Sequence, residues 1–139
     1  MGKLSLITDR QHNSLQGRVS EAEWATRVDL AAGCRVAYKF GWNKSIRNHF
    51  VARIPDEPDK ILINPRGLLW CELTASDFIK FDLYGNQITP SELPPGPAGL
   101  NFHSALLRLN PDRGASLHIH EGSSVAVSAM VGGLKYINQ

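Results

Sequence analysis

The 139-residue chain has little of what disulfide-rich and membrane proteins depend on. It holds only two cysteines, Cys34 and Cys71, which are too few for a disulfide framework and are expected to be reduced, buried thiols. No segment reaches the ~20 apolar residues that span a bilayer, and the N-terminus lacks the apolar run of a signal peptide. We therefore expect a soluble, cytoplasmic protein with no membrane partner.

Charge of one sign is also scarce. The chain has 15 Lys and Arg against 13 Asp and Glu, a net charge of +2. Nucleic-acid-binding domains usually carry a strongly basic patch, so this balance does not indicate a nucleic-acid partner. Hydrophobic residues make up 42% of the chain and charged residues 20%, which is typical of a globular protein rather than a disordered one. The length suits one domain with its own core.

The N-terminal third predicts an arm followed by a helix. Residues 1–19 are polar and lack periodicity, so we expect a flexible arm, with a single domain over residues 20–139. Ser20 and Glu23 form a capping box that starts a helix, and Gly41 is a plausible stop. An apolar residue recurs at every fourth position of this helix. The ridge consists of Trp24, Val28, Ala32, Val36 and Phe40. Gly33 interrupts the helix at a cost of about 1 kcal/mol relative to Ala, which suggests close packing against a neighbour.

The remaining segments alternate between strand and helix patterns. Residues 49–54 and 60–64 predict a hairpin around the proline-containing turn at 55–59. Residues 74–77 carry a second capping pattern, and residues 78–82 predict a third strand. After an irregular, proline-rich connection at 90–99, Phe102, Leu106 and Leu109 mark a short helix. Residues 115–120 alternate as a strand does, and residues 125–130 have helical spacing that Gly132 and Gly133 terminate.

His118 and His120 are the strongest local signal for chemistry. In a strand, residues i and i+2 face the same side, so two imidazoles can converge on one metal ion. The alternative is two histidines on a polar strand face. A catalytic zinc normally needs three protein ligands, and none of the other histidines is a convincing third. His12 lies in the arm, His49 opens a strand as a surface or hydrogen-bonded residue, and His103 fits a hydrogen-bonded position in the core.

A second candidate site follows the buried strand at 60–64. The loop contains Asn64, Arg66 and Gly67, and its backbone N–H groups could cradle an anion beside the arginine. Most such loops are simply turns, so this interpretation competes with a purely structural one.

Taken in order, these motifs resemble the class II aldolase/adducin family, from about Glu21 to the last residue. The residues that carry the resemblance are 30–35, Gly41-Trp42, 48–53, 63–67, 74–77, Asp82, Gly85, Phe102-His103, 110–112 and 118–120. The resemblance implies an α/β fold, a three-layer α/β/α sandwich with a central, mostly antiparallel sheet. It also implies that the last strands and helix of the fold lie beyond Gln139.

The resemblance further implies a divalent metal, usually zinc, held by His118, His120 and a histidine beyond Gln139. In the sugar-phosphate aldolases of the family, this metal polarises a carbonyl substrate, and active sites lie between subunits of a homo-oligomer. In these aldolases, a glutamate four residues before the helix histidine acts as the acid/base. Two serines just before that glutamate contact the substrate phosphate.

Several of these family residues are replaced in this chain. Gly99 stands at the glutamate position, Pro97 and Ala98 at the two serines, Val51 at a strand serine, and Arg66 at a frequent threonine. No catalytic residue is therefore assigned. Three hypotheses remain open. The chain could belong to a metal-dependent carbon–carbon lyase, aldolase or decarboxylase, acting on a non-phosphorylated carbonyl compound. It could instead be a non-catalytic, adducin-like scaffold that binds actin or another cytoskeletal protein, or a degenerate fragment with no independent function.

Overall fold

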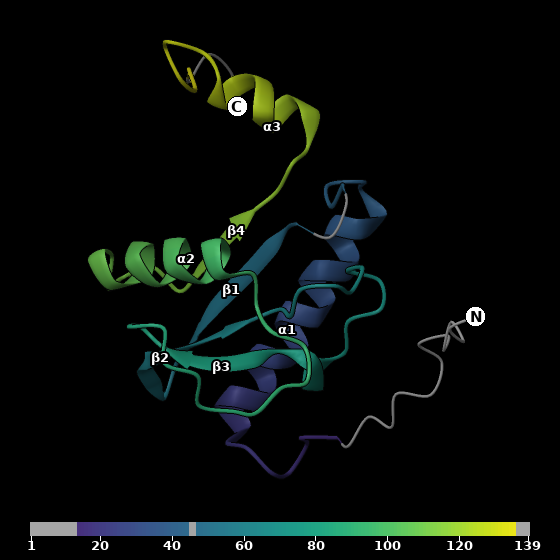
Figure 1. Ribbon diagram of the computed structural model, residues 1–139, viewed down its shortest axis with the longest axis vertical. Coiled ribbons are helices and arrows are strands. Elements are labelled where there is room, and N and C mark those ends of the chain that lie inside the picture. Colours follow the sequence, from purple (N-terminus) through teal and green to yellow (C-terminus); the bar gives the residue numbers. More distant parts are fainter. Residues whose placement is uncertain (1–13, 45–46, 136–139) are drawn as a thin grey trace, which may run out of the picture.

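The computed structural model describes residues 14–44 and 47–135 (Figure 1). Their elements, in chain order, are α1 (Glu21–Lys39), β1 (His49–Ile54), β2 (Glu57–Ile63), η2 (Ala75–Asp77), β3 (Ile79–Asp82), α2 (Pro97–Leu109), β4 (Ala115–His118) and α3 (Gly122–Ser128). Residues 1–13 of the predicted arm, His12 among them, lie outside the described residues. At the end of that predicted arm, the backbone N–H of Leu15 donates to Ser76 Oγ at 3.0 Å.

The four strands form one antiparallel sheet in the order β3-β2-β1-β4. Because side chains alternate along a strand, the sheet has two apolar faces. Helix α1 covers one face and α2 lies over the other, as Figure 1 shows. The predicted α/β sandwich with an antiparallel sheet is confirmed, and the described residues form its three layers.

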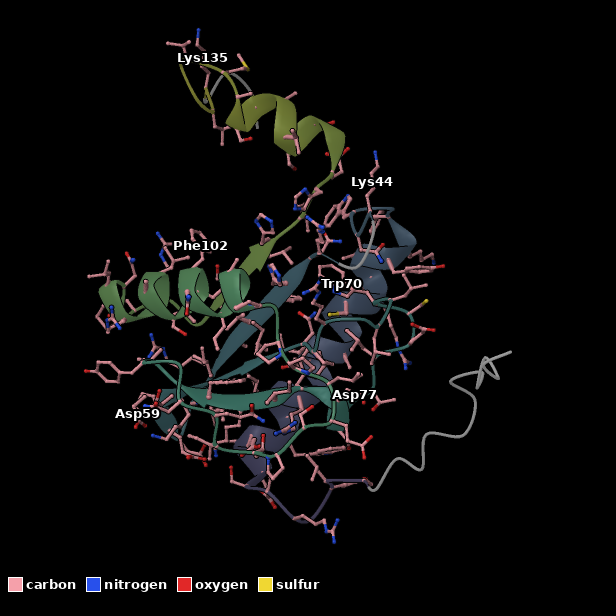
Figure 2. The ribbon with its side chains drawn as sticks, in the orientation of Figure 1. Lys44, Asp59, Trp70, Asp77, Phe102 and Lys135 are labelled. Atoms are coloured by element: carbon pink, nitrogen blue, oxygen red, sulfur yellow. The ribbon has the colours of Figure 1, made fainter. Side chains whose placement is uncertain are left out.

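Each face of the sheet has its own core. On the α1 side, Leu30 and Cys34 of the helix pack with Ile54 and Leu62 of the hairpin and with Trp70, all nearly inaccessible to solvent. The second core lies between the sheet and α2, and its buried members are Val51, Ile61, Ile63, Ile79, Phe81, Leu100 and Leu107. Trp70 points into the body of the molecule in Figure 2, whereas Phe102 lies on the outer side of α2 and is 57% exposed.

Helix α1 begins and ends where the sequence predicts, but its buried face is a different one. The Ser20 side chain accepts a hydrogen bond from the Glu23 N–H at 3.1 Å, and Gly41 adopts a left-handed φ of 73° after the helix. The predicted apolar ridge is mostly exposed, with Val36 at 51% and Phe40 at 65%. The buried residues of α1 are Glu23, Thr26, Arg27, Leu30, Ala31, Cys34 and Ala37. Glu23 and Arg27 can occupy buried positions because Lys80 of β3 pairs with Glu23 and the Phe78 carbonyl oxygen accepts a hydrogen bond from Arg27.

Gly33 packs closely against a neighbouring side chain, as predicted. A β-carbon at this position would lie 2.5 Å from Cε1 of Phe50, so the ring of β1 rests directly on the helix backbone. This contact lets α1 approach the sheet closely.

Smaller differences concern the ends of strands and one thiol. Strand β2 begins at Glu57, within the predicted turn, and β4 ends at His118 rather than His120. Cys34 is buried, and burial raises the pKa of its thiol to about 12. Cys71 is exposed, so the prediction of two buried thiols is wrong for this residue.

The last described helix lies apart from the sandwich. Helix α3 has no buried residue and extends from β4 away from the body in Figure 1. Across residues 14–44 and 47–135, no helix is long and apolar enough to cross a membrane.

Candidate functional site

His118 and His120 converge, although the strand ends between them. Their Nε2 atoms lie 2.9 Å apart, and the two rings are nearly perpendicular. The backbone N–H of His120 donates to Asn48 Oδ1 at 3.1 Å, which fixes the residue after the strand has ended. Two imidazoles on a tetrahedral zinc, with bonds of 2.0–2.1 Å, would place their nitrogens about 3.3 Å apart. The pair is therefore close to the arrangement that two metal ligands need.

Two further histidines join this pair on the α2 side of the sheet. His49 of β1 is the cross-strand partner of His118, and their rings stack with centroids 5.4 Å apart and planes inclined by 24°. His103 of α2 meets His49 edge to face at 5.8 Å. The sequence prediction treated His49 as a surface or hydrogen-bonded residue and missed this cluster. Two glycines in the first turn of α2, Gly96 and Gly99, are a signal that could have indicated a close neighbour.

His103 is a hydrogen-bonded core residue, as predicted. It is fully buried, and its Nδ1 lies 2.9 Å from Ser116 Oγ on β4. Its Nε2 is buried and finds no hydrogen-bond partner among the described residues. Burial, together with the nearby His49 and His118, lowers the pKa of His103 to about 4.

The pKa values of His49 and His118 are shifted in the same direction. Burial and then the charges of His118 and His120 lower the pKa of His49, and burial and then His120 lower that of His118. These imidazoles are therefore kept neutral near pH 7. Neutral imidazole is the form that ligates metals, so the electrostatics of the cluster suit a cation.

The described residues bring together two candidate metal ligands but no complete ligand set. Within residues 14–44 and 47–135, no group of three His, Cys, Asp or Glu side chains is placed to hold a metal ion. The neighbouring carboxylate of Glu121 caps α3, where it accepts the Ser124 N–H at 3.0 Å. Among the described residues, His118 and His120 are therefore the two candidate ligands for a divalent cation, with Nε2 atoms 2.9 Å apart.

The loop after β2 is held by its own hydrogen bonds. The amide of Asn64 accepts the Phe50 N–H at 2.8 Å and donates to the Asn48 carbonyl oxygen at 3.2 Å, so it joins the ends of β1 and β2. The Arg66 N–H donates to the Pro94 carbonyl oxygen at 2.9 Å, whereas the Arg66 side chain is exposed. Gly67 has a left-handed φ of 101°. Asn64 and the Arg66 N–H thus have structural partners, whereas the Arg66 guanidinium is exposed to solvent.

The first turn of α2 contains Pro97, Ala98 and Gly99, which stand where the resemblance implies two serines and a glutamate. Gly96 caps the helix without a side chain, and Pro97 is its first residue. A β-carbon at Gly99 would lie 2.6 Å from the His49 ring. The place where the resemblance calls for a carboxylate therefore has no room for a side chain while His49 keeps its position.

Comparison with known proteins agrees with this architecture. The family model of the Class II Aldolase and Adducin N-terminal domain matches residues 28–139. A Caulobacter vibrioides protein, whose name assigns it provisionally to the class 2 aldolases, is 44% identical over 126 residues, which cover 91% of this chain and 49% of that protein. Alpha-adducin of Rattus norvegicus is 40% identical over 128 residues, 88% of this chain and 17% of that protein.

Solved structures give the same result. An aldolase II superfamily protein from Pseudomonas syringae superimposes with a TM-score of 0.84 at 42% identity, covering 91% of this chain and 51% of that one. An L-fuculose 1-phosphate aldolase from Glaciozyma antarctica gives a TM-score of 0.71 at 25% identity, covering 84% of this chain and 47% of that one. The chain belongs to the class II aldolase and adducin N-terminal domain family. It spans about half the length of the first of the curated relatives and of these solved chains.

Proposed function

We propose that this chain is the metal-binding part of a class II aldolase-type lyase, in which His118 and His120 are two ligands of a divalent cation, zinc by its ligand chemistry. The approach of their Nε2 atoms to 2.9 Å carries the proposal. The use of a divalent metal is general among class II aldolases, and imidazole suits zinc. The third ligand would come from outside the described residues, from a further part of the protein or from another subunit of a homo-oligomer.

A bound divalent cation would supply Lewis-acid polarisation of a substrate carbonyl. The chain's own residues would hold it and keep His118 neutral, since burial lowers the pKa of that imidazole. Asn48 would orient His120 through the 3.1 Å hydrogen bond to its backbone N–H. Pro97, Ala98 and Gly99 offer no hydroxyl or carboxylate, so a small carbonyl compound without phosphate is the substrate class that suits this face.

Metal binding tests the proposal directly. Native mass spectrometry of the purified chain, with and without a chelator, should show zinc bound per chain and report the oligomeric state at the same time. Replacing both His118 and His120 by Ala should abolish uptake, whereas Gly114→Ala is a control that should retain it, because a β-carbon at Gly114 would have no neighbour within 4 Å. Unchanged uptake in the double variant would contradict the assignment.

A second candidate is a non-catalytic scaffold domain of the adducin type, with a cytoskeletal protein such as actin as its partner. The 40% identity to alpha-adducin and the glycine at position 99 favour it. Co-sedimentation with actin filaments tests this candidate. Pelleting with filaments in the double histidine variant as well as in the unchanged chain would support a scaffold role, and no pelleting in either would count against it.

A further inference from the structure

The first turn of α2 is built around the imidazole of His49. A β-carbon at Gly99 would lie 2.6 Å from both Nε2 and Cδ2 of this ring, and one at Gly96 would lie 3.2 Å from Nε2. Real β-carbons essentially never approach another heavy atom within 3.0 Å. The ring of β1 therefore rests on the bare backbone of the helix, and glycine at position 99 is a condition of that placement.

The same ring also stacks on His118. The two residues are directly opposed in the β1–β4 ladder, and their rings stack at 5.4 Å. His103 closes a third side, edge to face at 5.8 Å. The His49 ring thus contacts both the α2 backbone and the ring of a proposed metal ligand.

We infer that His49 is a positioning residue: its ring packs on the backbone at Gly99, stacks on His118 and fixes the His118 ring in the orientation that brings its Nε2 to His120. The inference rests on the proposed function for its metal, but the orientation of the ring is a property of the metal-free chain. It also explains the glycine at position 99, because a larger residue there would displace the His49 ring on which His118 stacks. Residues that orient metal ligands typically change metal affinity by about 10- to 100-fold when they are removed.

Four single variants separate this role from general packing. His49→Ala removes the ring that stacks on His118, and His49→Phe keeps a stacking ring without nitrogens. Gly99→Ala keeps every histidine, but its methyl group should displace the His49 ring. Gly114→Ala is the matched control, because a β-carbon at Gly114 would have no neighbour within 4 Å.

Two measurements are made on each variant. A Co²⁺ titration, followed by visible absorption, gives the affinity and the ligand geometry. Long-range ¹H–¹⁵N correlation spectra of the metal-free chain report the ring nitrogens of His118 and His120. A thermal melt confirms that each variant is folded, and if His49→Ala does not fold, Gly99→Ala carries the test.

We expect His49→Ala and Gly99→Ala to weaken Co²⁺ binding by about tenfold or more and to shift the His118 ring signals, as loss of an orienting contact does. His49→Phe and Gly114→Ala should stay within about threefold of the unchanged chain, because the stacking contact persists. Unchanged affinity and unchanged His118 signals in His49→Ala and Gly99→Ala would overturn the inference. If the unchanged chain binds no Co²⁺, the proposed function fails, and the His118 signals of the metal-free variants still decide the inference.

Discussion

The ammonium group of Lys80 lies 2.9 Å from the carboxylate of Glu23 and joins β3 to α1 through the inner layer of the sandwich. The other oxygen of Glu23 accepts the Arg27 Nε–H at 2.8 Å, and Arg27 also donates to the Phe78 carbonyl oxygen. Glu23 is 3% exposed and Arg27 is fully buried. Glu57, at the rim, contacts Lys80 from the solvent side. A buried carboxylate therefore holds two cations from different elements.

Glu23→Gln should destabilise the fold strongly. Removal of one partner from a buried ion pair leaves uncompensated charge, which costs about 3–5 kcal/mol. Glu57→Gln is the matched control, because the Glu57 side chain lies at the rim, 36% exposed, and its pair with Lys80 should contribute only about 0–1 kcal/mol. Urea denaturation at pH 7 gives both free energies of unfolding. Equal losses in the two variants would mean that the buried network is not what joins α1 to β3.

Gly33→Ala should also destabilise the chain, although alanine has a higher helix propensity than glycine. Alanine favours a helix interior over glycine by about 1 kcal/mol. Here the new methyl group would meet the Phe50 ring at 2.5 Å, and overpacking typically costs about 1–3 kcal/mol. Phe50→Leu in the same chain should relieve the clash, so the double variant should be less destabilised than the sum of the two single variants. Strict additivity in urea denaturation would contradict the contact.

Local signals in the sequence located the elements well. The capping box at Ser20 and Glu23 predicted the start of α1, and the strand predicted over residues 49–54 matches β1 (His49–Ile54). These features depend on residues within a few positions of one another. The convergence of His118 and His120 was likewise predicted from their spacing, since two residues of an extended segment share a side.

Contacts between distant segments were beyond such reasoning. The buried face of α1 includes Glu23 and Arg27 beside its apolar residues and differs from the predicted ridge. The two polar side chains can be buried because Lys80 and the Phe78 carbonyl oxygen pair with them. His49 joins the candidate site only through the pairing of β1 with β4. In both cases the contacting residues are too far apart in the sequence for a periodic pattern to reveal the contact.

Asn64→Ala should cost stability even though the residue is a candidate for anion binding. Its amide satisfies the Phe50 N–H and the Asn48 carbonyl oxygen, and each buried polar group left without a partner costs about 1–3 kcal/mol. Arg66→Ala, at an exposed side chain in the same loop, should change the free energy of unfolding by no more than about 0.5 kcal/mol. Thermal or urea unfolding distinguishes the two. A neutral Asn64→Ala would contradict the structural role given to this amide.

The free energy of unfolding should fall as the pH is lowered from 7.5 to 5. The pKa of His103 is about 4 in the folded chain, against an ordinary value of 6.5, because burial and then His49 and His118 disfavour its charged form. The unfolded chain therefore binds the proton more readily between these values, and the stability present above pH 6.5 is lost as the pH falls towards 4. For His103 alone, this linkage amounts to about 2 kcal/mol between pH 7.5 and 5.

A matched variant assigns this pH dependence to His103. Asn keeps an amide near Ser116 but does not titrate, so His103→Asn should lose stability at pH 7.5 and show a shallower fall towards pH 5. Urea denaturation across this range measures both effects. The lowered pKa values of Asp59, Asp82 and Glu121 place their titration below the same window, so these carboxylates do not obscure it. His49 and His118, shifted in the same direction, would account for the slope that remains, whereas an unchanged slope would show that His103 is not held neutral by its burial.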